Sequence, residues 1–206
     1  MPLQEAFFEL LQGSTQGGPT PESVWEEVVR RHSEKHRHYH KLQHLEDIHA
    51  ALSIDRGTLD GPDAVLIAIA FHDSVYAVHR KDNEERSAAL MRTLMAPFHL
   101  PAPTIERAVR HILATKDHTA SQDPDTDVFT DADFSILGAD AERYDQYTRQ
   151  IRSEFAIYPD LLYKPGRRKV LQHFLTMPSI FKTTLFRERF EAQAKANLER
   201  ELLASS

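Results

Sequence analysis

The chain has 206 residues, of which 41% are hydrophobic and 27% charged, and it carries a formal net charge of −6 when its histidines are neutral. These values are ordinary for one globular domain, and the acidic balance disfavours sequence-independent binding to a nucleic-acid polymer, which requires a basic surface. Cysteine is absent, so disulfides and thiolate metal ligands are excluded, and any metal must be held by nitrogen and oxygen atoms.

The residue pattern is helical nearly throughout, because glycine is scarce and alternating strand patterns are rare. Thr20 followed by Pro21 is typical of a helix start, with threonine at the N-cap and proline in the first turn. The pattern predicts a helix from this point, followed by helices over residues 38–54, 62–76, 84–95, 103–115, 140–157, 159–177 and 183–203. An interruption of the helix over 159–177 near Pro165 is left open.

Several shorter features separate these helices. Gly57–Gly61 is expected to be a turn, and the polar residues 117–128 a long loop. Residues 129–137 are expected to form a short segment that ends at Gly138. Asn83 and Asp140 are expected to cap the helices that follow them. We predict one all-α domain over residues 1–206, with a candidate metal site inside about 36–140.

Nothing in the sequence indicates a membrane span or an export signal. No apolar stretch reaches the roughly 18 residues of a membrane span. Residues 1–5 contain no basic region ahead of an apolar run, which a signal peptide would need. We therefore expect a cytoplasmic location and no membrane partner.

Histidine is the compositional outlier, with 12 copies. His40 and His44 stand four residues apart, so on a helix their side chains would share a face and could both ligate one metal ion. An amphipathic helix with two incidental histidines would have the same spacing. We expect six other histidines to be surface or partly buried side chains: His32, His36, His49, His79, His99 and His173.

His72 and Asp73 directly follow an apolar run, Ala64–Phe71, which is expected to form a buried helix. Burying an unpaired carboxylate costs several kcal/mol, roughly, so it needs a partner, and a divalent metal would serve. The alternative is a helix C-terminus at which the histidine complements the dipole and the aspartate is solvated.

A second acidic pair, Asp131 and Asp133, precedes the apolar turn that ends at Gly138. Asp131 could cap a short helix by accepting backbone N–H bonds, and Asp133 would then lie in the first turn of that helix. Capping explains Asp133 less well than Asp131.

In sequence order the candidates are His44, His72–Asp73 and Asp133. The order His … His-Asp … Asp is the signature of the HD superfamily of metal-dependent phosphohydrolases, and this chain resembles one bacterial branch of it. Six fragments carry the resemblance over nearly the whole chain: Tyr39–His44, Phe71–Tyr76, Asn83–Ala88, Thr130–Gly138, Gly166–Leu171 and Ala194–Leu198. The resemblance implies an HD-like helical bundle with additional C-terminal helices.

The resemblance implies four metal ligands: His44, His72, Asp73 and Asp133. Asp133 is chosen over Asp131 because the family's ligand is followed by phenylalanine, as Asp133 is by Phe134. His40 is a weaker match, and it would support a ligand or face a phosphate group. Some HD proteins hold a second metal through histidines in the middle of the domain, where His111 and His118 lie here.

A set of imidazole and carboxylate ligands suits Mn²⁺, Fe²⁺, Co²⁺, Ni²⁺ or Zn²⁺ better than Mg²⁺. A bound divalent metal lowers the pKa of water from 15.7 towards ~7 and polarises a phosphoryl oxygen. The expected reaction is therefore attack of metal-activated water on phosphorus.

Candidate catalytic and substrate-binding residues lie near the ligand segments. Glu84 and Glu85 could position or deprotonate the water, although two acids in a first helical turn also complement the helix dipole. Four cations could bind phosphate oxygens, the alternative being solvated surface charges: Arg37, Arg80, Lys81 and Lys116.

We expect a metal-dependent phosphohydrolase that acts on a small phosphorylated metabolite, with a nucleotide favoured by the resemblance alone. One alternative is an HD-fold di-iron oxygenase, which would require both His111 and His118 as ligands. Another is a non-catalytic regulatory protein that binds a metal. A homodimer is left open.

Overall fold

The computed structural model describes residues 1–14, 18–53 and 59–204, and in this part of the chain the secondary structure is helical without a strand. The all-α class predicted from the sequence is therefore confirmed. Gly57 and Thr58, the first two residues of the expected turn Gly57–Gly61, lie outside the described residues. The chain divides into two compact units, residues 1–130 and 131–206, where the sequence led us to expect one domain.

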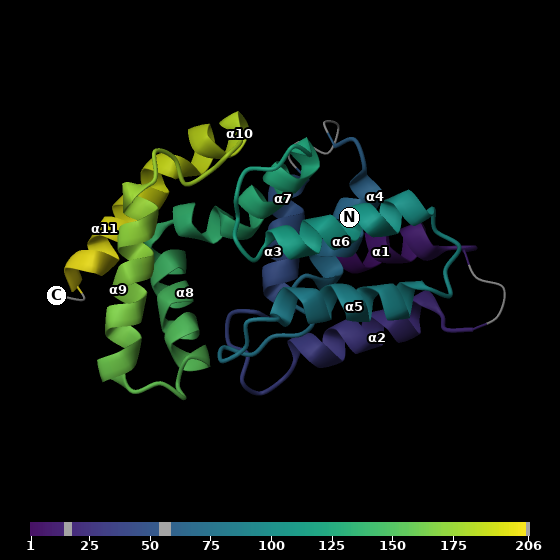
Figure 1. Cartoon of the computed structure of the whole chain (residues 1–206), viewed down its shortest axis with the longest axis horizontal. Coiled ribbons are helices and arrows are strands. Elements are labelled where there is room, and N and C mark those ends of the chain that lie inside the picture. The colour runs from purple at the N-terminus through teal and green to yellow at the C-terminus, as the bar shows by residue number, and fades with distance from the viewer. Residues whose placement is uncertain (15–17, 54–58, 205–206) are drawn as a thin grey trace. The chain divides into compact units, whose positions relative to one another are not determined.

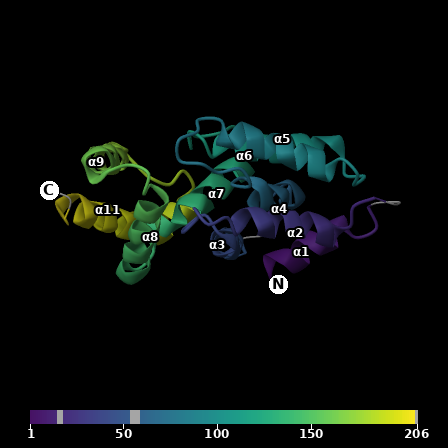
Figure 2. The ribbon, with the colours of Figure 1, turned by 90° about the horizontal axis from the view of Figure 1, so that it is seen from below.

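The N-terminal unit is a bundle of helices (Figures 1 and 2). Its helices are α1 (Leu3–Leu11), α2 (Pro21–His32), α3 (Leu42–Leu52), α4 (Pro62–Phe71), α5 (Asn83–Met95), α6 (Ala102–Ala114) and most of α7 (Pro124–Asp133). The sequence reasoning missed α1, a helix of nine residues in which Leu3, Phe7 and Leu11 recur at the helical spacing of four and are buried.

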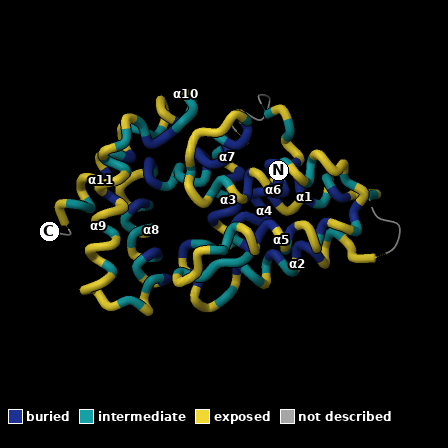
Figure 3. Tube along the Cα trace, in the orientation of Figure 1, coloured by how far each residue is buried: buried dark blue, intermediate teal, exposed yellow. Residues whose placement is uncertain are grey.

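Helix α4 lies at the centre of this unit, where α1, α3, α5 and α6 pack against it. Apart from Leu66, every residue from Ala64 to Phe71 is buried, and the tube in Figure 3 is dark blue along this helix. Because neighbours cover the helix on several sides, its sequence is apolar all round rather than amphipathic. The helix ends at Phe71, five residues before the predicted end near Tyr76.

Two of the three predicted caps are confirmed. Thr20 Oγ1 accepts from the Ser23 N–H at 3.3 Å, and Asp140 Oδ1 accepts from the Arg143 N–H at 2.9 Å. Asn83 is not a cap but the first residue of α5. Its side-chain amide instead pairs with the backbone N–H and carbonyl of Ala77, which braces the turn ahead of α5.

Two further predicted boundaries were wrong for local reasons. The helix expected over 38–54 begins only at Leu42, because residues 37–41 form a bent segment held by Arg37. The loop expected over 117–128 ends at Asp123, and α7 begins at Pro124. Proline in the first position followed by Asp125 and Asp127 is a typical helix start that the polar composition concealed.

The C-terminal unit follows from the last turn of α7. Its elements are the 3₁₀ helix η2 (Phe134–Gly138), α8 (Ala141–Glu154), α9 (Asp160–Thr176), α10 (Thr184–Phe186), the π-helical turn η3 (Arg187–Glu191) and α11 (Ala192–Ala204). Helix α9 continues through Pro165 without interruption. Gly138 is required where η2 meets η3, because an added Cβ would lie 2.6 Å from Phe190 Cβ.

No helix in the described part of the chain combines the length and the hydropathy needed to cross a membrane.

Candidate metal centre

Three candidate ligands meet in the N-terminal unit. His44 projects from α3, while His72 and Asp73 follow the last residue of α4. The Nε2 atoms of His44 and His72 are 3.3 Å apart. Asp73 Oδ2 lies 3.0 Å from His72 Nε2 and 3.6 Å from His44 Nε2. The predicted convergence of these three side chains is therefore present in the structure.

The triangle of these three atoms has the dimensions of a metal-ligand face. Divalent transition metals bind imidazole nitrogen and carboxylate oxygen at about 2.0–2.2 Å, which separates neighbouring ligand atoms by about 3.0–3.5 Å. The observed separations are 3.0–3.6 Å. His44 and His72 are both buried and could hold a metal ion together with a carboxylate.

A backbone contact sets the orientation of the His72 imidazole. His72 Nδ1 lies 3.1 Å from the carbonyl oxygen of Ile69, one turn earlier in α4. Nδ1 carries a proton to donate to this carbonyl, so Nε2, the nitrogen that faces His44 and Asp73, is the one that would bind a metal. Metal-ligating histidines typically have such a second partner.

The Asp73 carboxyl is ionised in this surrounding. Burial opposes its ionisation, but the imidazoles of His72, His40 and His44 together hold the pKa of Asp73 well below its usual value. Its side chain is 19% exposed, against 1% for His72 and 2% for His44. The site is thus a carboxylate at the edge of two buried imidazoles, with its open side toward solvent.

His40 lies beside this set but does not share a helix with His44, so the predicted arrangement of the pair on one helical face was wrong. Its Nε2 is 4.0 Å from Asp73 Oδ2. The His40 ring packs against Tyr76 at 4.2 Å between ring centroids, and Tyr39 packs against His44 at 4.7 Å. These aromatic contacts support the imidazoles from the side.

Arg37 was a candidate for binding phosphate, but its side chain is fully buried and is not available to a substrate. Its guanidinium donates to the carbonyl of Asp73 at 2.7 Å and to those of His40 and Ser74 at 3.3 Å each, and its Nε donates to Glu34 at 3.0 Å. A single buried cation therefore ties the segment before α3 to the segment after α4.

The two candidate acids of α5 differ in their surroundings. Glu84 is half-buried, and burial raises its pKa, with smaller raising effects from the charges of Glu85 and Asp73. Glu85 is exposed and forms an ion pair with Lys116, which also donates to the Lys81 carbonyl at 2.9 Å. Glu84 is therefore the better candidate for proton transfer.

The remaining predicted cations lie in or against the turn between α4 and α5. Arg80 contacts Asp82 at 3.4 Å, and both side chains are exposed. Lys81 is also exposed, and Lys116 is engaged with Glu85. None of these contacts places a cation on the three ligands.

Asp131 and Asp133 occupy different positions at the end of α7. The buried Asp131 carboxylate accepts from the backbone N–H groups of Lys182 and Thr183 at 2.7–3.0 Å, so it anchors the chain ahead of α10 within the C-terminal unit. This is a capping role, although for another segment than the expected one. Asp133 is the last residue of α7, four residues after Phe129.

The two candidates for a second metal site, His111 and His118, are differently placed. His111 is buried, with Nδ1 at 2.7 Å from Thr126 Oγ1 and its ring 6.2 Å from that of Phe129. In the described residues its Nε2 has no hydrogen-bond partner. His118 lies beyond α6 with a positive φ of 49°.

The expectation that His32 and His49 are surface or partly buried was wrong, because both side chains are buried. His32 Nδ1 donates to the Val28 carbonyl at 2.8 Å. Burial lowers the pKa of His32 to about 3. It is therefore a neutral core histidine, which its spacing in the sequence did not reveal.

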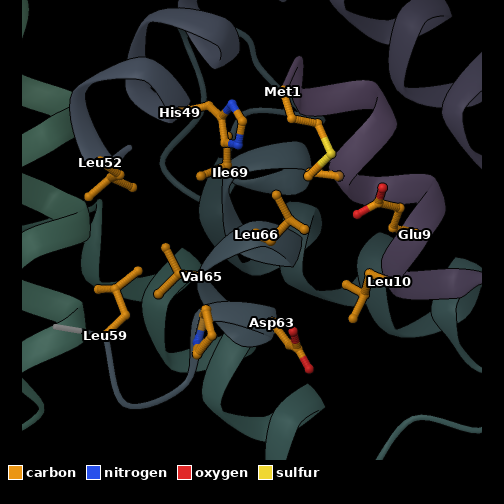
Figure 4. A pocket seen from close by; sticks show the side chains of 12 residues that line it. Met1, Glu9, Leu10, His49, Leu52, Leu59, Asp63, Val65, Leu66 and Ile69 are labelled. Carbon is orange, nitrogen blue, oxygen red and sulfur yellow. The ribbon is translucent and has the colours of Figure 1, made fainter. Parts of the chain in front are cut away.

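A separate hollow of about 280 Å³ lies among α1, α3 and α4 (Figure 4). Its walls are mainly apolar, with Leu10, Leu66 and Ile69 among them, and Glu9 and Asp63 add two carboxylates. The three ligand atoms do not line it, so the candidate chemistry is not in this hollow.

Comparison of the chain with protein-family models, with curated proteins and with solved structures gave no match. The assignment of a function therefore depends on the residues and their geometry.

The buried His111 predicts an acid-sensitive fold. Burial lowers its pKa to about 4, below the ordinary 6.5, so the unfolded chain gains a proton that the folded chain does not. Above pH 6.5 the histidine therefore leaves the free energy of unfolding undiminished. As the pH falls from 6.5 to about 4, the free energy of unfolding decreases by about 3 kcal/mol. Urea unfolding of metal-free protein across this range measures it. His111→Gln should reduce the slope without abolishing it, because the buried His32 contributes with the same sign. The exposed His173→Gln should leave the slope unchanged, and equal slopes in all three proteins would contradict the assignment.

Proposed function

We propose that this protein is a metal-dependent phosphohydrolase whose metal is held by His44, His72, Asp73 and Asp133. The observation that carries the proposal is the triangle formed by two buried imidazole nitrogens and one carboxylate oxygen at 3.0–3.6 Å. Three such groups brought together without a cation would leave a carboxylate partly desolvated, which a divalent ion would compensate.

The fourth ligand, Asp133, is supported by the register of α7. The ring of Phe129 packs against the ring of His72 at 5.8 Å between centroids. Residues four apart share a face of a helix, so Asp133 follows Phe129 on the same side of α7. The competing residue Asp131 is already engaged by two backbone N–H groups.

Two imidazoles and two carboxylates favour Mn²⁺, Fe²⁺, Co²⁺, Ni²⁺ or Zn²⁺ over Mg²⁺. A four-ligand set leaves positions open for water and substrate in a six-coordinate ion. When bound, the ion would acidify a water molecule and polarise a phosphoryl oxygen. The open side at Asp73 is where a substrate phosphate would approach.

Glu84 would take the proton from the attacking water. Its raised pKa, caused first by burial, brings the carboxyl closer to neutral pH and makes it a more effective base. Its charge and that of Asp73 affect one another, so the two groups lie in one electrostatic environment. Glu85 has the same side chain but is held by Lys116 in solvent.

The substrate class proposed is a small phosphorylated metabolite, with a nucleotide favoured by the resemblance to HD phosphohydrolases. The exposed Arg80 and Lys81 are the cations that remain accessible to a phosphate group near α5. At the partly exposed edge of the ligands, the rings of His40 and Tyr76 would contact the rest of the molecule. The di-iron alternative would require two further ligands, His118 and the buried Nε2 of His111, whose Nδ1 pairs with Thr126.

The first prediction from this proposal concerns metal content. The purified protein should carry about one equivalent of a transition metal, and His72→Ala should lose it because one of the buried nitrogen ligands is gone. Elemental analysis measures both. The exposed His79→Ala should retain the metal, since His79 lies outside the ligand set. Absence of metal from the unmodified protein, and no uptake of Mn²⁺, Ni²⁺ or Fe²⁺, would reject the proposal.

A substitution of Arg37 tests whether metal binding depends on the hydrogen bonds that hold the segments carrying the proposed ligands. Lysine keeps the charge in Arg37→Lys but donates from a single nitrogen, so it cannot reproduce the planar fork that reaches Glu34 and three carbonyls. The affinity for added Co²⁺ should therefore fall by about 10–100-fold. Isothermal titration measures this affinity. The matched control is Arg107→Lys, because Arg107 bridges Asp123 and Asp125 at the start of α7 instead. Equal loss in both variants would mean that the effect is general destabilisation.

Glu84 separates catalysis from metal binding. Glu84→Gln should lower kcat by about 10²–10⁴-fold while the metal content is unchanged, because the amide cannot accept the proton. Glu85→Gln is the control and should keep most of the activity. The measurement is phosphate release from a panel of nucleotides and sugar phosphates with the metal found in the protein. Full activity of Glu84→Gln would remove Glu84 from the mechanism.

A further inference from the structure

The connection between α8 and α9, together with the first turn of α9, exposes three large aliphatic side chains within six residues. Ile157 is 63% exposed, Leu161 85% and Leu162 64%. Ile157 lies in the connection, and Leu161 and Leu162 lie in the first turn of α9. The connection is at one end of the C-terminal unit (Figure 1). Single exposed aliphatic side chains are common on protein surfaces, but a cluster of this kind marks an interaction site.

This connection is a built structure, because α8 and α9 hold it from both sides. Arg152 donates to the Phe155 and Tyr158 carbonyls at 3.1 and 3.2 Å and to Asp160 at 2.7 Å. Its guanidinium also lies over the ring of Tyr163, 4.6 Å from the ring centroid. The three aliphatic side chains are therefore presented from an ordered turn.

Basic residues adjoin the aliphatic ones on the outer face of α9. Lys164, Arg168 and Lys169 are all exposed. Lys164 and Arg168 follow Leu161 at spacings of three and seven residues, and Lys169 follows Leu162 at seven, so cations and leucines share helical faces. Lys164 lies 3.6 Å from the exposed Asp160, and against this one acid the three cations leave an excess of positive charge in a chain whose net charge is −6.

We propose that the α8–α9 tip, defined as Ile157, Leu161, Leu162, Lys164, Arg168 and Lys169, docks the protein on a lipid surface that contains anionic headgroups. Aliphatic side chains next to lysine and arginine are the combination that binds such surfaces, because the side chains enter the acyl boundary while the cations meet the headgroups. This goes beyond the proposed hydrolase activity, and it differs from the sequence expectation of no membrane partner.

Charge argues against a second copy of the chain as the occupant. In a two-fold symmetric contact the same patch faces itself, so Lys164, Arg168 and Lys169 of one copy would meet the same cations of the other. Like charges that face each other across an interface disfavour its formation. An anionic lipid surface complements both the aliphatic and the basic parts of the tip.

The test is flotation of the full chain with phosphatidylcholine vesicles, with and without phosphatidylserine. We expect binding to the phosphatidylserine vesicles only, weakened by salt. The double variant Leu161→Ser, Leu162→Ser should reduce binding by about tenfold or more, because it removes the aliphatic contribution. Leu203→Ser is the matched control, since Leu203 is 78% exposed but lies outside the tip.

Three outcomes would overturn this proposal. The first is absence of vesicle binding by the unmodified chain. The second is equal binding by the Leu161→Ser, Leu162→Ser variant and the unmodified chain. The third is a dimer, measured by light scattering, that this variant dissociates, which would make the tip a contact between copies. Metal content and phosphatase activity are measured on the same samples. A failure of the hydrolase proposal can therefore be told apart from a failure of the vesicle-binding proposal.

Discussion

The guanidinium group of Arg37 lies where the buried helix α4 ends, and the arrangement of the candidate ligands depends on it. When a helix is buried on all sides, the carbonyl groups at and beyond its last turn still need hydrogen-bond donors. Arg37 donates to the carbonyls of Asp73 and Ser74, and the same group reaches the carbonyl of His40. One buried cation therefore satisfies the end of α4 and fixes the two segments that carry the imidazoles and the carboxylate.

The electrostatic consequence is a carboxylate that stays ionised in a partly buried position. Burial works against the charge on Asp73, whereas His72, His40 and His44 favour it. The Ile69 carbonyl holds a proton of His72 on Nδ1, so Nε2 is the nitrogen that faces His44 and Asp73. Burial also keeps His32 and His111 neutral, because it lowers the pKa of each below the ordinary value and outweighs the neighbouring carboxylates.

The two units carry different kinds of candidate function. The N-terminal unit has a rigid centre in which α4 is packed by four other helices, which suits a site whose ligand atoms must be held within a few tenths of an ångström. The C-terminal unit presents the α8–α9 tip, where aliphatic and basic side chains are exposed together. Packing therefore holds the candidate metal site in place, whereas the α8–α9 tip stays exposed for contact with a partner.

The sequence by itself determined the all-α class, most helix positions, and the caps at Thr20 and Asp140, because periodicity and capping are local. It singled out His72 and Asp73 as candidates because an apolar run that ends in His-Asp is unusual, and His44 through the resemblance. Tertiary structure alone decided the rest. The burial of Arg37, the bent segment that removes His40 from α3, and the use of Asp131 to hold Lys182 and Thr183 all involve partners distant in sequence. From sequence alone a charged side chain is expected to be exposed to solvent. Only the fold shows which backbone carbonyl or N–H groups it pairs with.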